Sequence, residues 1–163
     1  MYTRLLLILL LGTTLMCSCQ TEPLPVNSLA DRVTEGTSKD RILFRIIADE
    51  NNSSKDYFEI SSEDGKVLIT GNSDLSLSTG LNWYLKYVAG IHLSWNNLSQ
   101  KLPEVLPLPQ ETIRKETSMQ ARYYLNYCAY SYSMAFWDWE RWEKEIDWMA
   151  LHGINMPLSI TGM

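Results

Sequence analysis

The sequence predicts an α/β protein in two parts: a small N-terminal α+β domain, and then a β-α-β unit that opens a second domain. Three observations carry this prediction. Strand-like apolar runs and helix-like periodic runs follow one another over residues 26–98. A proline-containing polar stretch covers residues 99–118. An apolar strand, a capped helix and a second apolar strand then fill residues 119–163.

Composition bounds the class of protein. A length of 163 residues allows one or two small domains. Hydrophobic residues make up 45% and charged residues 20%, which is ordinary for a globular chain. The net charge is −5 and there is no basic run, so we expect no nucleic-acid partner.

The first 18 residues have the pattern of a bacterial export signal. A positive charge at Arg4 precedes an unbroken apolar run at residues 5–11, which is too short to span a bilayer. Ser18 then precedes Cys19, and a small residue followed by cysteine is typical of a lipoprotein signal. We expect cleavage before Cys19, lipid attachment to its thiol, and a short tether to the membrane at residues 19–25.

Two alternatives stay open for this segment. Cys17 is a weaker candidate for the lipid because the bulky Met16 precedes it. A conventional secretory signal with incidental cysteines also fits. Either interpretation exports the protein, and we expect a periplasmic or outer-membrane lipoprotein. Export implies an oxidising compartment, where a lipidated chain keeps Cys128 as its free thiol and forms no intrachain disulfide.

The first half of the α+β domain, which we place at residues 26–98, is predicted in this order. Apolar residues at helical spacing indicate a short amphipathic helix from Val26 to Val33. The apolar, β-branched run at residues 42–48 predicts a buried strand. Residues 57–61 and 66–70 predict a hairpin, because the turn between them contains a glycine that tolerates positive φ.

The second half of this domain is predicted as a helix and a short strand. Asp74 is the expected N-cap of a helix that runs to about Val88, and Gly90 is expected to end it. Residues 92–95 predict the strand. The apolar face of the helix, which we expect to pack on the sheet, comprises Leu77, Leu81, Tyr84, Leu85 and Val88.

Residues 99–118 are expected to form an extended surface linker, because three prolines interrupt regular structure there. The second part then predicts a strand at 121–127, an aromatic loop at 128–137, a helix from its N-cap Asp138 to about His152, and a strand at 154–160. Gly153 is the expected helix stop. The helix is expected to pair Glu140 with Lys144 and to bury the stripe Trp139, Trp142, Ile146, Met149 and Ala150.

Asn126 and Cys128 are the candidate ligand-binding residues. In a parallel α/β barrel, side chains at the carboxyl ends of the strands line the active site, and strand alternation would point both residues the same way. The second strand would end near Thr161 and Gly162. The Asn amide suits sugar hydroxyls, because it offers a donor and an acceptor. The competing interpretation is that Asn126 caps backbone groups and Cys128 packs in the core.

The carboxylates of the last helix are interpreted as a solvated charged face. Glycoside hydrolysis needs two carboxylates about 5–9.5 Å apart across the scissile bond, and one helix on the outside of a barrel does not offer that arrangement. His92 and His152 lie far apart in the sequence with no partner ligand pattern, so we expect no metal site. No Gly-rich phosphate loop is present either, and we expect no cofactor. The carboxylates in question are Asp138, Glu140, Glu143, Glu145 and Asp147.

Two stretches resemble a known family. The run "WDWERWEKEIDWMALHGIN" resembles the opening of the catalytic barrel of the α-N-acetylglucosaminidase family, glycoside hydrolase family 89. The run "FEISSEDGKVLITGNSDLSLSTGLNWYLKYVAGIHLSW" resembles the small domain that precedes that barrel. The resemblance covers about residues 26–163. It implies a TIM-type (β/α)8 barrel that starts near residue 119.

The resemblance also implies an activity. Members of the family remove terminal α-linked N-acetylglucosamine from glycans with retention, use two glutamates and need no metal. Asn126 and Cys128 match the family positions that help line the sugar pocket. The two catalytic glutamates lie further along the barrel, and no position of this sequence matches them.

The sequence stops after the second expected barrel strand, whereas a complete (β/α)8 barrel takes about 250 residues. We therefore expect a truncated product or an incomplete gene model that is inactive alone. The alternative is a non-enzymatic lipoprotein that binds a glycan or a protein partner.

Overall fold

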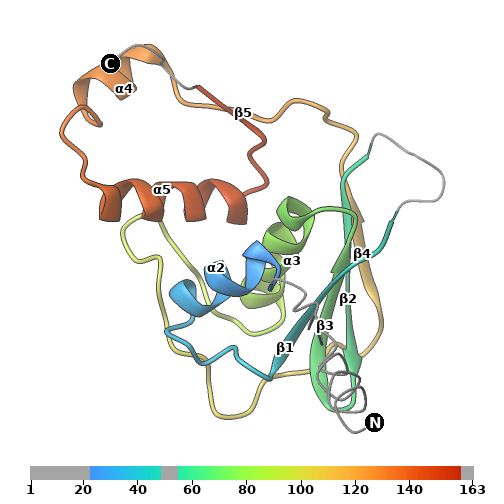
Figure 1. The fold of residues 1–163 in the computed structure, drawn as a ribbon. Coiled ribbons are helices and arrows are strands. Elements are labelled where there is room, and N and C mark those ends of the chain that lie inside the picture. The colour runs from blue at the N-terminus through green and yellow to red at the C-terminus, as the bar shows by residue number, and fades with distance from the viewer. Residues whose placement is uncertain (1–22, 49–54, 159–163) are drawn as a thin grey trace, which may run out of the picture.

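A computed structural model describes residues 23–48 and 55–158 of the chain. A four-stranded sheet forms one side of the molecule, α2 and α3 cover one of its faces, and α5 lies beyond them (Figure 1). The predicted signal, the lipidation candidate Cys19, and Thr161 and Gly162 fall outside the described residues. Among the residues described, none of the helices combines the length and apolar character needed to cross a bilayer.

The first helix, α2, spans Pro25–Val33 and confirms the predicted amphipathic helix. Proline at the start of a helix costs no hydrogen bond, because the first amide groups have no partner within the helix. The four apolar residues of the predicted stripe are all buried against the core: Val26, Leu29, Ala30 and Val33.

The sheet has the strand order β1-β3-β2-β4. The central strands β2 (Tyr57–Glu63) and β3 (Lys66–Gly71) form the predicted hairpin, and β1 (Ile42–Ile46) runs parallel to β3. The hairpin turn has positive φ at both central residues, 51° at Asp64 and 75° at Gly65, which matches the twist of the strands. Strand β1 can run parallel to β3 because the antiparallel strand β2 lies between them in the sequence and returns the chain to the starting edge.

The expectation of a buried strand at residues 42–48 is wrong for its second half. The strand β1 lies at an edge of the sheet, and Ile46 and Ile47 are each 41% exposed. An apolar, β-branched run does not distinguish an edge strand from a central one, because β propensity measures side-chain packing that the sequence does not reveal.

The linker interpretation of residues 99–118 needs correction, because this segment belongs in large part to the first domain. Strand β4 (Ile113–Glu116) pairs antiparallel with β2 and closes the other edge of the sheet. Leu102 is buried in the core, and the Tyr84 hydroxyl donates a hydrogen bond to the Pro107 carbonyl at 3.0 Å. The prolines stop helix formation without detaching the segment.

Helix α3 spans Asp74–Tyr87, but its N-cap is Ser73 and not Asp74. The Ser73 backbone is extended, and its Oγ accepts a hydrogen bond from the Ser76 amide at 3.1 Å. Asp74 is the first helical residue, where a carboxylate is favourable next to the positive end of the helix dipole. Gly90, at φ 69°, follows the helix as predicted.

Helix α3 packs closely on the sheet, and Gly80 permits the approach. A Cβ atom at Gly80 would lie 2.8 Å from Cγ2 of Ile69 in β3. The predicted strand at residues 92–95 is not formed; the structure has only an isolated bridge there, between Ser94 and Asn97. The predicted helix face is confirmed at its fully buried members, Leu77, Leu81, Tyr84 and Leu85.

The second part contains the predicted β-α-β unit. Strand β5 (Tyr123–Tyr124) pairs in parallel with β6 (Met156–Pro157), and helix α5 (Trp139–Leu151) connects them. Both strands are shorter than expected. A short helix, α4 (Tyr127–Tyr132), takes up the end of the predicted first strand and the start of the predicted loop.

The boundaries of α5 confirm the sequence signals. Asp138 is the N-cap, and its Oδ1 accepts a hydrogen bond from the Arg141 amide at 2.9 Å. Gly153 follows the helix at φ 70°. The Lys144 ammonium lies 2.8 Å from the Glu140 carboxylate, which confirms the predicted pair.

Candidate functional site

Asn126 lies directly after β5 and forms the N-cap of α4. Its backbone is extended, and its Oδ1 accepts a hydrogen bond from the Ala129 amide at 2.9 Å. The competing interpretation of Asn126 as a cap is therefore confirmed. The bond uses Oδ1 and leaves the amide nitrogen of this exposed side chain outside the cap.

Cys128 is on the first turn of α4, so the idea that it shares a strand face with Asn126 is wrong. The cause is Leu125, whose φ of 76° turns the chain out of the extended conformation one residue after β5. The Cys128 thiol is exposed, which also makes the core-packing alternative wrong. The part that either residue plays in binding a substrate stays a prediction.

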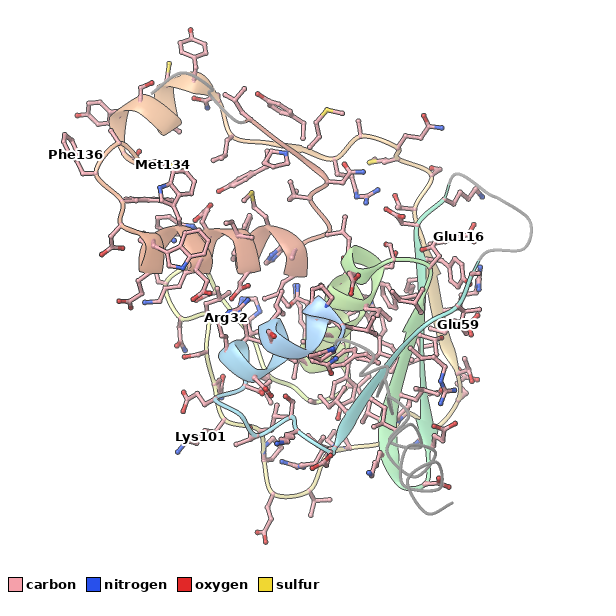
Figure 2. The ribbon with its side chains drawn as sticks, in the orientation of Figure 1. Arg32, Glu59, Lys101, Glu116, Met134 and Phe136 are labelled. Atoms are coloured by element: carbon pink, nitrogen blue, oxygen red, sulfur yellow. The ribbon has the colours of Figure 1, made fainter. Side chains whose placement is uncertain are left out.

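Large aromatic side chains surround this end of β5 and face solvent. Figure 2 shows Phe136 at the outer rim of the molecule, and its side chain is 94% exposed. The predicted buried stripe of α5 is wrong at Trp139 and Ile146, which are 69% and 45% exposed. The other exposed aromatic residues of this region are Tyr123, Tyr127 and Tyr132.

The interpretation of the α5 carboxylates as a solvated face is wrong for Glu145, which is fully buried. Its Oε1 accepts a hydrogen bond from the Tyr124 hydroxyl at 2.9 Å. Its Oε2 accepts from Trp95 Nε1 at 2.7 Å and from the Arg141 guanidinium at 2.9 Å. The guanidinium of Arg141 also lies over the Trp137 ring, 3.9 Å from its centroid.

The same interpretation is wrong for Asp147, which is 4% exposed. Arg32 of α2, labelled in Figure 2, donates to it from Nε to Oδ2 at 2.7 Å and from a terminal nitrogen to Oδ1 at 2.6 Å. This two-pronged pair raises the pKa of Arg32 through the hydrogen bond to Asp147. Glu140, which is exposed, fits the original interpretation.

These contacts decide what the carboxylates can do chemically. Both oxygens of Glu145 and both oxygens of Asp147 accept hydrogen bonds, and each carboxylate has an arginine beside it. A general acid must carry a proton that it can donate, and a nucleophile must face the anomeric carbon. Glu145 and Asp147 are therefore structural groups that join α5 to α2, to residue Trp95 and to β5.

One of the contacts of Glu145 and Asp147 could have been predicted from the sequence. Arg141 and Glu145 are four residues apart on one helix, a spacing that favours an ion pair. The partners Arg32 and Trp95 lie 115 and 50 residues away from their carboxylates, and no local pattern marks such contacts. Burial of Tyr124 and, to a smaller extent, its hydrogen bond to Glu145 raise the pKa of this phenol to about 12.

Two cavities lie near α5, and neither is lined by Asn126 or Cys128. One, of about 430 Å³, is between α5 and the loop after Trp95 and includes Arg32, Glu143 and Asp147. The other, of about 260 Å³, is between α3, β4 and Arg122. In the described part of the chain, no cluster of three or more His, Cys, Asp or Glu side chains is placed to hold a metal ion.

Comparison with known families gives matches in both parts of the chain. The model of the α-N-acetylglucosaminidase (NAGLU) N-terminal domain matches residues 24–108. The model of the TIM-barrel domain of the same enzyme matches residues 122–163. Human α-N-acetylglucosaminidase is 41% identical over 97 residues, which cover 60% of this chain and 13% of that protein.

Comparison with solved structures gives matches in the same family. A family 89 glycoside hydrolase from Clostridium perfringens, in complex with 2-acetamido-1,2-dideoxynojirmycin, has a TM-score of 0.74 and 40% identity over 83% of this chain. A second Clostridium perfringens structure, in complex with its substrate GlcNAc-α-1,4-galactose, has the same TM-score and identity over 82% of this chain. The chain spans 15% of the length of either structure. The fold prediction is confirmed: a small α+β domain precedes the start of a TIM barrel.

Proposed function

Because the chain belongs to the α-N-acetylglucosaminidase family, we propose that it is the N-terminal portion of an exported enzyme that removes terminal α-linked N-acetylglucosamine from glycans with retention. The observation that carries the proposal is the match of both parts in the order that the enzyme has them. Identity of about 40% extends through the α+β domain and into the barrel unit, so the likeness is more specific than a shared fold.

Within that enzyme, we propose that the N-terminal domain supports the first barrel unit and that the end of β5 forms one edge of the sugar site. The carboxyl end of β5 carries Asn126 and then Cys128, and the active sites of TIM barrels lie at the carboxyl ends of the strands. In this proposal the Asn126 amide nitrogen donates to a sugar hydroxyl, which is supported by a cap on α4 that uses Oδ1 alone. No cofactor or metal ion enters the proposal.

The 163-residue chain by itself is proposed to be inactive. Retaining hydrolysis needs an acid/base carboxyl and a nucleophilic carboxylate about 5–5.5 Å apart. Glu145 and Asp147, the buried carboxylates of α5, are fully engaged by hydrogen bonds that hold the fold. We therefore propose that neither Glu145 nor Asp147 belongs to the catalytic pair.

The test compares the chain with a chimaera. In the chimaera, the part of this chain that aligns with the Clostridium perfringens enzyme replaces the corresponding region of that enzyme. Both proteins are assayed with an aryl α-N-acetylglucosaminide, and the anomer released first is identified by NMR. We expect turnover with retention by the chimaera and none above background by the chain. Turnover by the chain alone, or a folded chimaera without activity, would refute the proposal.

Attachment to a membrane through Cys19 is a further part of the proposal, supported by the leucine-rich run and the Ser18-Cys19 pair. About 0.8 kcal/mol per buried CH₂ makes two or three acyl chains a firm anchor. Expressed with its signal in a bacterium, the chain should take up labelled fatty acid and partition into detergent. Cys19→Ala should abolish the labelling, whereas Cys17→Ala should leave it intact; the reverse result would assign the lipid to Cys17.

A further inference from the structure

One carboxylate connects the N-terminal domain to the strand that leads into the candidate sugar site. Glu145 is fully buried and is bonded by side chains from three places: Trp95 of the N-terminal domain, Tyr124 of β5, and Arg141 of its own helix. We call these four residues the Glu145 latch. It is the Tyr124 bond that reaches the site, because Asn126 is two residues further along the chain.

Tyr124 is held at three points. Its hydroxyl donates to Glu145 at 2.9 Å, its backbone carbonyl accepts from the Leu158 amide at 2.9 Å, and its ring lies 5.2 Å from that of Trp148. The first contact fixes the end of the side chain, the second fixes the strand register, and the third packs the ring on α5. Tyr124 is thus the last fixed point of β5 before the chain turns.

Leu125, the next residue, is in the left-handed region with φ 76°. This conformation is unfavourable for a residue with a Cβ atom, so it persists only where neighbouring contacts impose it. On one side the imposing contact is Tyr124, and on the other it is the cap that Asn126 forms on Ala129. The kink places Asn126 and Cys128 at the start of α4 instead of in the strand.

We infer that Glu145 and Tyr124 are positioning residues for the sugar site, and that the N-terminal domain acts on the site through them by holding the Leu125 kink. The inference rests on the proposed function for its meaning in catalysis. The structural part of the inference is independent of the proposed function: the Glu145 latch determines where Asn126 lies.

The first test uses the 163-residue chain and needs no activity. Exchange of the Ala129 amide hydrogen, which reports the Asn126 cap, is measured by NMR. Tyr124→Phe removes the hydroxyl that binds Glu145 and should speed this exchange by about 2- to 10-fold, the range expected for one lost hydrogen bond. Tyr84→Phe is the matched control, since it removes a buried phenol hydroxyl whose partner is Pro107, away from β5.

A second pair of variants separates the latch from general loosening. Glu145→Gln weakens the acceptor of Tyr124, whereas Asp147→Asn weakens the other buried carboxylate of α5, which bonds Arg32 and not β5. We expect faster Ala129 exchange in the first variant alone. Equal exchange in Tyr124→Phe and Tyr84→Phe, or equal acceleration in Glu145→Gln and Asp147→Asn, would overturn the inference.

The kinetic arm uses the chimaera described above. Tyr124→Phe should raise KM for an aryl α-N-acetylglucosaminide by about 2- to 10-fold with little change in kcat, since a displaced Asn126 loses binding to ground state and transition state alike. Asp147→Asn should lower thermal stability and leave both constants unchanged. An inactive chimaera would refute the proposed function, and the exchange data would still decide the latch.

Discussion

At the scale of single residues, two carboxylates of α5 bond this helix to Tyr124 of β5, to Trp95 and to Arg32 of α2. Glu145 and Asp147 are two positions apart on α5, and both are buried. A buried charge is tolerated only when it is paired and hydrogen-bonded, and both meet that condition. Charged residues usually lie on the solvated face of a helix, so their type alone argues for exposure.

The Arg32–Asp147 pair should contribute measurably to stability. Arg32→Ala leaves the Asp147 carboxylate buried without its two donors, and breaking a buried pair costs about 3–5 kcal/mol. The Arg32 side chain is 39% exposed, so water can replace part of what it supplied. We expect a loss of about 1–3 kcal/mol in the free energy of unfolding, measured by urea denaturation.

Lys144→Ala is the control for that measurement. It breaks the Lys144–Glu140 pair, in which both side chains are well exposed, and should cost less than about 0.5 kcal/mol. A loss for Arg32→Ala as small as the loss for Lys144→Ala would show that the pair at Asp147 is not structural.

Tyr84 gives a pH prediction. Burial raises the pKa of this fully buried phenol to about 12, from an ordinary value of 10.0. Between these values the unfolded chain releases the proton and the folded chain keeps it. Stability from this group is therefore intact below pH 10 and declines as the pH rises towards 12, by about 1.4 kcal/mol per unit.

Urea denaturation at pH 9.5 and pH 11 tests this sign. Tyr84→Phe should be less stable than the parent at the lower pH, because it loses the bond to Pro107, and should show a shallower decline between the two values. An identical decline in both proteins would mean that Tyr84 titrates normally in the folded state.

At the scale of elements, several helices and turns that depend on local sequence patterns could be predicted. Elements that depend on partners distant in the sequence could not. The periodicity of α2, the positive-φ turn after β2 and the cap and stop of α5 are all written within a few residues, and all are confirmed. Strand β4 was not predicted, because its only regular partner is β2, more than fifty residues earlier. Helix α4 was not predicted, because the Leu125 kink that starts it depends on contacts with α5 and β6.

The end of α5 offers a test at this scale. Gly153→Ala introduces a Cβ atom at φ 70° and 3.1 Å from the Thr79 Oγ1 atom of α3. Gly90→Ala meets the same backbone strain at φ 69° with no atom within 4 Å. We expect a loss of about 1 kcal/mol for Gly90→Ala and of about 2–3 kcal/mol for Gly153→Ala, measured by thermal denaturation.

The difference between the two variants measures how tightly the end of α5 packs on α3. Asn82 of α3 donates a hydrogen bond to the Leu151 carbonyl at 3.0 Å, so a second contact from α3 holds the chain two residues before Gly153. Equal losses would indicate that α5 moves away from Thr79 freely, and that the second part is not fixed on the first.

At the scale of the whole molecule, the family and the order of the two parts could be predicted, whereas the way they are joined could not. Composition predicts boundaries at residues 98 and 118, but Leu102 is buried in the N-terminal core, Pro107 bonds Tyr84, and β4 pairs with β2. Arg122 spans the junction, since its guanidinium donates to Asp56 of the first part and to the Gly153 carbonyl of the second. A linear sequence does not display such contacts.

The position of Asn126 in the fold could be predicted from the sequence, whereas its part in binding a substrate stays a prediction. Asn126 does stand at the carboxyl end of β5, as the resemblance implied. The alternation rule failed for Cys128, because it assumes that the strand continues and the strand ends at Tyr124. To predict a site from the ends of strands, one must know where each strand ends. That position depends on contacts with residues distant in the sequence, so local patterns do not give it.

The measurement that tests the account most directly is the activity of the chimaera with Asn126→Ser. Serine keeps an N-cap oxygen for the Ala129 amide and removes the amide nitrogen, so α4 should stay capped while sugar binding is lost. With one or two sugar hydrogen bonds at roughly 1.5 kcal/mol each, kcat/KM should fall by about 10- to 200-fold with the melting temperature unchanged. An unaltered kcat/KM in a folded Asn126→Ser chimaera would contradict the claim that this end of β5 belongs to a sugar-cleaving site.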